Sequence, residues 1–73
     1  MSALPYHINL FWSGEDGCWV ADVPDLKYCT SHGDTPTEAL ANVQDAMTGW
    51  LEVAQSNGFA IPQPTYRPGI YAA

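Results

Sequence analysis

The sequence predicts an α+β fold: a small antiparallel sheet in β-β-β-α-β order, with one long amphipathic helix packed on one face. Three observations predict it. Apolar residues occur at every second position in two stretches near the N-terminus. A capping signal at Thr35 precedes a stretch with the apolar spacing of a helix, and the end of the chain is rich in proline. With 73 residues, 47% of them hydrophobic, we expect a single domain with its core in residues 5–58 and an extended Pro-rich tail in residues 59–73.

The first two strands are expected to form a hairpin. Tyr6–Trp12 and Cys18–Val23 each alternate between apolar and mixed positions. If both apolar rows share one core, even positions of the first strand must oppose odd positions of the second. This pairing requires a loop with an even number of residues, such as Ser13–Asp16. The predicted core rows are Tyr6, Ile8, Leu10 and Trp12 in the first strand and Trp19, Ala21 and Val23 in the second.

A third strand should follow a proline turn. Pro24-Asp25 favours a turn, and Lys27–His32 is expected to return as a strand that ends at Gly33. A three-residue loop at this corner would place Cys29 opposite Ala21 on the core face.

The helix has the clearest boundaries. Thr35 and Glu38 form a capping box with Pro36 at the first helical position, and Asn57-Gly58 is a stop signal, so we expect a helix from about Pro36 to Asn57. Its predicted apolar face holds Ala39, Leu40, Val43, Met47, Trp50, Leu51 and Ala54.

The remaining chain is rich in proline. Ile61–Gly69 is expected to be an extended tail, with a short edge strand near Tyr66 or Ile70-Tyr71.

The net charge of −6 arises from eight carboxylates against Lys27 and Arg67. Such a surface repels phosphate backbones, so direct nucleic-acid binding is not expected. A basic protein partner would be attracted, although the same charge is also explained by solubility alone. No apolar run is long enough to span a membrane, and Met1–Pro5 lacks the basic residues of a secretion signal, so we expect a cytoplasmic protein.

Most candidate catalytic or metal-binding residues have a simpler structural explanation. Cys18 and Cys29 should lie on opposite sheet faces and not form a disulfide, and they have no metal-binding spacing. His7 and His32 have no helical partner that would make a metal site. The carboxylates near the corner have turn or capping roles, so neither a catalytic cluster nor a metal or cofactor is expected; they are Asp22, Asp25, Asp34 and Glu38. The tryptophans Trp12, Trp19 and Trp50 are expected in the core rather than around a ligand.

The sheet face away from the helix is the candidate interface. A small monomer buries its apolar residues poorly, so we expect a homo-oligomer that uses this face or the sheet edge for docking. The residues expected on this face are His7, Asn9, Phe11, Cys18 and Val20.

The order and spacing of these turn and capping signals resemble the HicB-like antitoxin domain from about Tyr6 to Pro64. The pattern runs through "DGCWVADVPDL", a cysteine, "GDTPTEAL" and a helix that ends before "GFAIPQP". The match is carried by Pro24, Asp25, Leu26, Cys29, Gly33, Asp34, Thr35, Glu38 and Ala39, which in the family shape the domain rather than catalyse. Where the family commonly has Pro-Gly before the cysteine, this chain has Lys27-Tyr28, which alters the corner.

The resemblance implies a degenerate RNase H-like fold and a protein-binding role. HicB-like proteins neutralise HicA-type toxins, which are small basic ribonucleases, and an acidic chain suits such a partner. The C-terminal DNA-binding segment of many antitoxins is not seen in this sequence, so operator binding by this chain is not expected.

The sequence also bears on two other classes of function. A metal-dependent nuclease of RNase H type needs a carboxylate in the middle of the first strand, and the sequence there is His-Ile-Asn-Leu-Phe. An orphan homo-oligomeric interaction domain differs from an antitoxin only in its partner, and the sequence does not distinguish the two.

Overall fold

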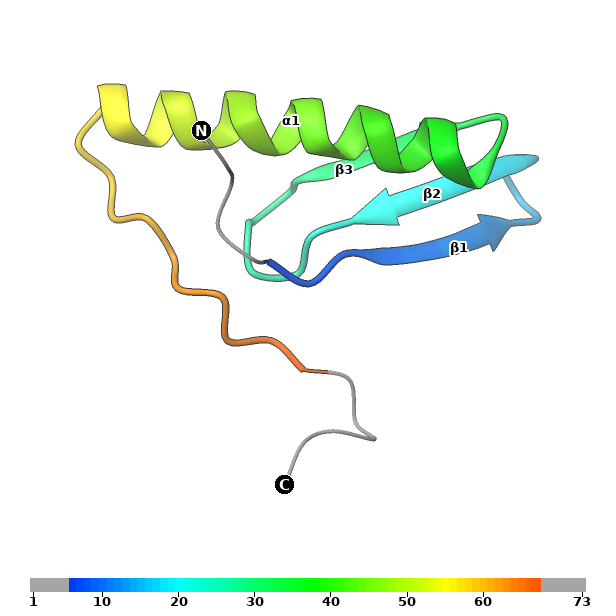
Figure 1. Ribbon diagram of the computed structural model, residues 1–73, viewed down its shortest axis with the longest axis horizontal. Helices are drawn as coiled ribbons and strands as arrows, with labels where there is room; N and C mark the ends of the chain where they lie inside the picture. The colour runs from blue at the N-terminus through cyan, green and yellow to red at the C-terminus, as the bar shows by residue number, and fades with distance from the viewer. Residues whose placement is uncertain (1–5, 68–73) are drawn as a thin grey trace.

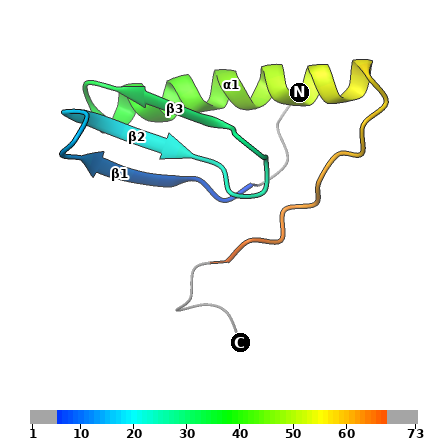
Figure 2. The same ribbon diagram turned by 180° about the vertical axis from the view of Figure 1, so that it is seen from behind.

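The computed structural model describes residues 6–67 and has a sheet of three strands followed by one helix (Figure 1). The elements are β1 (Asn9–Ser13), β2 (Cys18–Asp22), β3 (Thr30–Gly33) and α1 (Pro36–Ser56). The sheet has the order β1-β2-β3, and both pairs are antiparallel. Figure 2 shows from behind that α1 runs along β3 and that β1 is the strand farthest from it. The predicted α+β fold class is confirmed.

The first hairpin has the predicted parity. Leu10 lies opposite Ala21 and Trp12 opposite Trp19, so even positions face odd ones. The loop has four residues, as an even loop requires, but it is Gly14–Gly17, one residue later than expected, because Ser13 still pairs with Cys18. The Gly17 N–H donates to the Ser13 carbonyl at 2.8 Å, and Gly17 has a φ of +63°, which glycine adopts without strain.

The core lies between the helix and the half of the sheet formed by β2, β3 and the corner that joins them. Leu26, Val23 and Val43 are the largest side chains that are completely buried. The buried residues that pack together are Tyr6, Ala21, Val23, Leu26, Cys29, Ala39, Val43 and Met47, with Ile8, Trp19, Leu40, Ala46, Trp50 and Leu51 partly buried against them.

The prediction that Leu10 and Trp12 belong to the core was wrong. Trp12 is 53% exposed and Leu10 is also exposed, although both lie on the helix side of the sheet. The reason is the position of α1, which lies over β3 and leaves the far edge of the sheet uncovered (Figure 1). Trp12 instead packs edge to face against Trp19, with ring centroids 5.8 Å apart, an arrangement that aromatic rings prefer.

The third strand is shorter than expected because the corner before it is longer. β3 begins at Thr30 rather than Lys27, since Val23–Cys29 forms two consecutive turns. Cys29 therefore lies beside Val23, whose N–H donates to the Cys29 carbonyl at 3.0 Å, and the residue opposite Ala21 is Ser31. The predicted pairing of Cys29 with Ala21 was wrong, but Cys29 is buried as expected.

The helix begins and ends at the predicted signals. Thr35 Oγ1 accepts from the Glu38 N–H at 3.1 Å, and Glu38 Oε1 accepts from the Asp34 N–H at 2.8 Å. At the other end the Gly58 N–H donates to the Gln55 carbonyl and the Phe59 N–H to the Ala54 carbonyl. These two bonds form a Schellman motif, which the positive φ of Gly58 permits.

The tail after the helix contacts Tyr6 and the corner between β2 and β3, and it forms no strand in residues 59–67. The Tyr6 hydroxyl donates to the Pro62 carbonyl, and the Tyr66 N–H donates to the Asp25 carboxylate at 3.1 Å. The strand expected near Tyr66 is thus replaced by a side-chain contact, and Ile70-Tyr71 lies outside the described residues.

Candidate functional site

The corner between β2 and β3 is built from the two consecutive turns. The Leu26 N–H donates to the Val23 carbonyl at 3.1 Å, and the Cys29 N–H donates to the Leu26 carbonyl at 3.1 Å. Pro24 occupies the second position of the first turn, where its fixed φ is favoured. Leu26 connects the two turns and is buried, so the corner is anchored in the core.

Tyr28 has an unusual backbone conformation in the second turn. It is the third residue of that turn and has a φ of +63°, the single positive φ outside glycine among residues 6–67. This is the geometry of a type II turn, which favours Pro-Gly at its two central positions, and Lys27-Tyr28 occupies them here. The left-handed conformation costs a non-glycine residue about 1–2 kcal/mol. The Tyr28 side chain is 91% exposed, so burial of the ring does not offset this cost.

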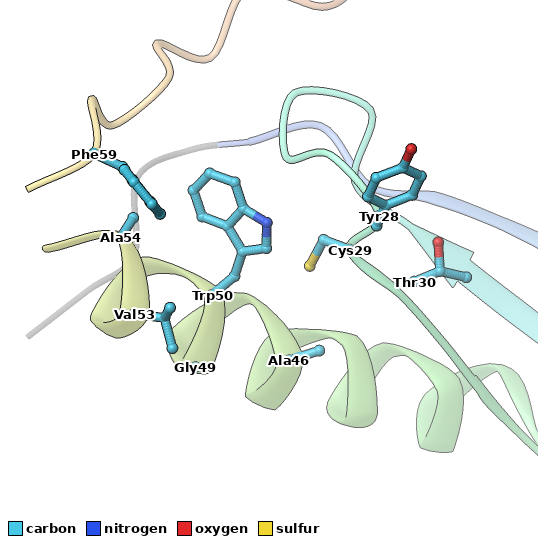
Figure 3. Close-up of a pocket in the computed structure, with 9 residues that line it drawn as sticks. All are labelled: Tyr28, Cys29, Thr30, Ala46, Gly49, Trp50, Val53, Ala54 and Phe59. Carbon is cyan, nitrogen blue, oxygen red and sulfur yellow. The ribbon is translucent and has the colours of Figure 1, made fainter. Parts of the chain in front are cut away.

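A groove opens beside this corner, between α1 and β3 (Figure 3). The helix and the strand are in close contact at Gly33, where an added Cβ would lie 2.6 Å from the Ala39 nitrogen. They diverge toward the other end of β3, and Asn42 Nδ2 bridges part of the gap by donating to the His32 carbonyl at 2.7 Å. The open end encloses about 420 Å³ and is lined by Tyr28, Cys29, Thr30, Ala46, Gly49, Trp50, Val53, Ala54 and Phe59.

The rim of the groove is aromatic and exposed. Phe59 is exposed and is held over the last turn of the helix by the Schellman motif, while Tyr28 stands at the opposite side (Figure 3). Between them Trp50 is half-buried, and its Nε1–H donates to the Lys27 carbonyl at 3.0 Å, which ties the helix to the corner. The groove therefore presents apolar surface to solvent with its walls held in place.

Acidic residues follow the helix next to this groove. Glu38, Asp45 and Glu52 are seven residues apart, so they lie along one side of α1, and all three are exposed. That row adjoins the helix residues that line the groove, Ala46, Gly49 and Val53. Carboxylates therefore flank the helix side of the groove, while the Lys27 ammonium lies 5.6 Å from the centroid of the Tyr28 ring at its rim.

The face of the sheet away from the helix contains the residues predicted as an interface. The strand register places Phe11, Val20 and His32 in one row and Asn9, Asp22 and Thr30 in the next. Phe11 is 48% exposed and Val20 is half-buried. A hollow of about 540 Å³ lies on this face, and its lining residues are Asp16, Gly17, Cys18, Val20, Thr30, Ser31, His32 and Asp34.

The polar members of that predicted interface already have partners. His7 Nε2 lies 2.6 Å from Asn9 Oδ1, and Asn9 Nδ2 donates to Asp22 Oδ2 at 3.0 Å. The His7 ring also packs against Tyr66, with centroids 4.9 Å apart. These contacts leave Phe11 and Val20 as the apolar centre of the face.

The two cysteines are free and differ in environment. Burial, and to a smaller degree the nearby Asp22 carboxylate, raises the pKa of the Cys29 thiol above its usual 9.0. A raised pKa favours the unreactive thiol form, so Cys29 behaves as a small apolar wall of the groove. Burial likewise raises the pKa of the Tyr6 phenol, with a further contribution from Asp25.

The residues that carry the family resemblance are mostly structural in this fold. Gly33 permits the close approach of α1, Ala39 is completely buried beneath it, and Thr35 with Glu38 caps the helix. Asp25 has a role that sequence reasoning missed: its carboxylate accepts from the Tyr66 N–H and from the Thr65 hydroxyl at 3.2 Å, which holds the tail.

Sequence reasoning also missed the groove. Its rim residues Tyr28, Val53 and Phe59 were not candidates, because periodicity does not reveal where a helix and a strand diverge. The one available signal was the replacement of Pro-Gly by Lys27-Tyr28, which brings a large side chain to a position that favours glycine.

Within residues 6–67 no three histidine, cysteine or carboxylate side chains are arranged to hold a metal ion. No helix in the same range is long and apolar enough to cross a membrane.

These features define a small α+β domain whose distinguishing elements are surfaces: an apolar groove, a hollow on the open sheet face and two strand edges. The chain belongs to the family described as "HicB_like antitoxin of bacterial toxin-antitoxin system", which matches residues 6–69.

Two curated proteins are similar to it. A UPF0150 protein of Thermoplasma acidophilum is 37% identical over 49 residues, which cover 67% of this chain and 71% of that protein. A UPF0150 protein of a Synechocystis species is 40% identical over 38 residues, covering 52% of this chain and 55% of that protein. No solved structure matches the chain significantly.

Proposed function

We propose that this chain is an antitoxin that binds and neutralises a small basic HicA-like ribonuclease. The observation that carries the proposal is the family match across residues 6–69. The net charge of −6 and the acidic row beside the groove support a basic partner, because opposite charges speed encounter and suppress wrong partners.

Co-expression with any small basic protein encoded beside this chain tests the proposal. We expect the two to co-purify at low salt, the complex to weaken as salt rises, and the chain to restore growth to cells in which the basic protein alone is toxic. A neighbouring basic protein that remains toxic and does not co-purify would refute the antitoxin role.

We further propose that the chain acts in the cytoplasm as one domain, without catalysis, cofactor or direct contact with nucleic acid. A nuclease assay of the pure protein with Mg²⁺ or Mn²⁺ tests the absence of catalysis. RNA cleavage that disappears in Asp25→Asn or Asp34→Asn would contradict it, because a true metal nuclease depends on its carboxylates.

A second candidate is a homo-oligomeric interaction domain. Leu10, Phe11 and Trp12 are consecutive, exposed and located on an edge strand, which favours self-association. If His7, Asn9, Phe11, Cys18 and Val20 form the contact between copies, Phe11→Asp should give monomers, because the contact would bury an unpaired charge. Light scattering measures the oligomeric state of the parent, of Phe11→Asp and of the control Gln44→Asp, which makes the same kind of change at an exposed helix position. A parent that is monomeric at high concentration would refute the homo-oligomer.

A further inference from the structure

The edge of β3 that faces away from β2 is the feature from which we draw a further inference, since no other strand pairs with it within residues 6–67. The Val23 N–H bonds the Cys29 carbonyl, and hydrogen-bonded pairs alternate along an antiparallel ladder. Ser31 and Gly33 therefore direct their backbone groups toward β2, while Thr30 and His32 direct theirs away from it. Asn42 donates to the His32 carbonyl, so within residues 6–67 the Thr30 N–H, the Thr30 carbonyl and the His32 N–H remain at the edge.

The two faces of this edge differ in chemistry. On the helix side lies the apolar groove, whose helical wall is Ala46, Gly49 and Val53 (Figure 3). On the open side lies the hollow whose lining residues include Asp16 and Asp34. Thr30 lines both.

We propose that the β3 edge takes an extended segment of a basic partner protein as an added strand. Side chains alternate between the faces of a strand, so such a segment would place apolar residues in the groove and Lys or Arg residues over the hollow. The required partner sequence thus alternates apolar and basic residues. A second copy of this chain does not fit that description, because it has only Lys27 and Arg67 as basic residues and neither lies in an alternating apolar run.

This inference rests on the proposed binding of a basic protein and adds where and how that protein docks. Tyr28 and Phe59 would enclose the apolar side chains at the open end of the groove. The strained backbone of Tyr28 is consistent with this role, since a glycine there would form the turn without strain but would supply no side chain.

A synthetic peptide of alternating lysine and valine, with blocked ends, is the probe. Titrated into the full chain and followed by amide chemical shifts, it should perturb Thr30, His32 and Val53. The same peptide N-methylated at every residue keeps its charge but has no amide hydrogen on either edge to pair with β3, and we expect it to bind at least about ten-fold more weakly, as a loss of ladder bonds implies. A glutamate-valine peptide should not bind.

Gly49→Lys provides the matched protein variant. It places bulk and positive charge in the groove, and because an added Cβ meets nothing within 4 Å, the helix should be at least as stable as in the parent. We expect at least about a ten-fold loss of lysine-valine peptide affinity, with no loss for Gln44→Lys, which makes the same charge change at an exposed helix position outside the groove.

Three results would overturn the inference: no shifts at millimolar peptide, shifts confined to Leu10 and Trp12 at the other edge, or equal binding of the methylated peptide. If a neighbouring toxin co-purifies equally with the parent and Gly49→Lys, the docking site is wrong while the antitoxin role stands. If no neighbouring protein is captured but the lysine-valine peptide binds at β3, the antitoxin role fails and the docking site stands.

Discussion

Gly33→Ala tests the contact that positions the helix on the sheet. The added Cβ would lie 2.6 Å from the Ala39 nitrogen and 2.9 Å from the Glu38 carbonyl carbon. Carbon contacts are optimal at about 3.5–4.0 Å, so the helix start and β3 must separate by about 1 Å. Both neighbours are backbone atoms in the first turn of α1, where the capping bonds of Thr35 and Glu38 oppose such a movement.

The expected cost follows from two opposing terms. Overpacking of this kind destabilises by about 1–3 kcal/mol, while replacing glycine restricts the unfolded chain and stabilises by about 0.4–1 kcal/mol. The net loss in the free energy of unfolding should be about 1–2 kcal/mol, and the melting temperature should fall by roughly 5–15 °C for a domain of this size.

Urea denaturation followed by tryptophan fluorescence, at one fixed protein concentration, measures this loss. Gly49→Ala is the control, because the same substitution meets no atom within 4 Å in the helix interior and should stabilise by about 0.5–1 kcal/mol. If Gly33→Ala were as stable as the parent, close packing at this glycine would not be what holds α1 on β3.

The other predictions concern the corner, the cap and the buried thiol. Tyr28→Gly should raise the free energy of unfolding by about 1 kcal/mol, because removal of the left-handed strain outweighs the freedom that glycine adds to the unfolded chain. A melting temperature below that of the parent would contradict this. Thr35→Ala should lower the free energy of unfolding by about 1 kcal/mol through loss of the cap. An unchanged melting temperature would show that the Thr35 cap does not determine where the helix begins. The folded pKa of Cys29 lies above the unfolded value near 9.0, so its contribution to stability is present below pH 9 and is lost as pH rises through the folded pKa. Cys29→Ala should therefore flatten the alkaline fall in a plot of unfolding free energy against pH, and an equally steep fall would show that another group is responsible.

Features that depend on neighbours in the chain were predicted from the sequence. The capping box at Thr35 and Glu38 and the stop at Asn57-Gly58 each involve hydrogen bonds within a few residues, so residue types alone indicate them. The hairpin parity was likewise determined by two apolar rows that must share one face. The family followed from the order of these local signals along the chain.

The tertiary structure alone decided which apolar residues became buried. Alternation puts Leu10 and Trp12 on the same face as the core, but α1 lies over β3, so both remain exposed. The same placement opens the groove at Tyr28, and the tail is held by Asp25 across forty positions of sequence rather than by a strand. Periodicity indicates the face of the sheet on which a side chain lies. Burial depends in addition on where a distant element crosses that face. The position of α1 is determined by the packing of the whole core, around contacts such as Gly33 against Ala39.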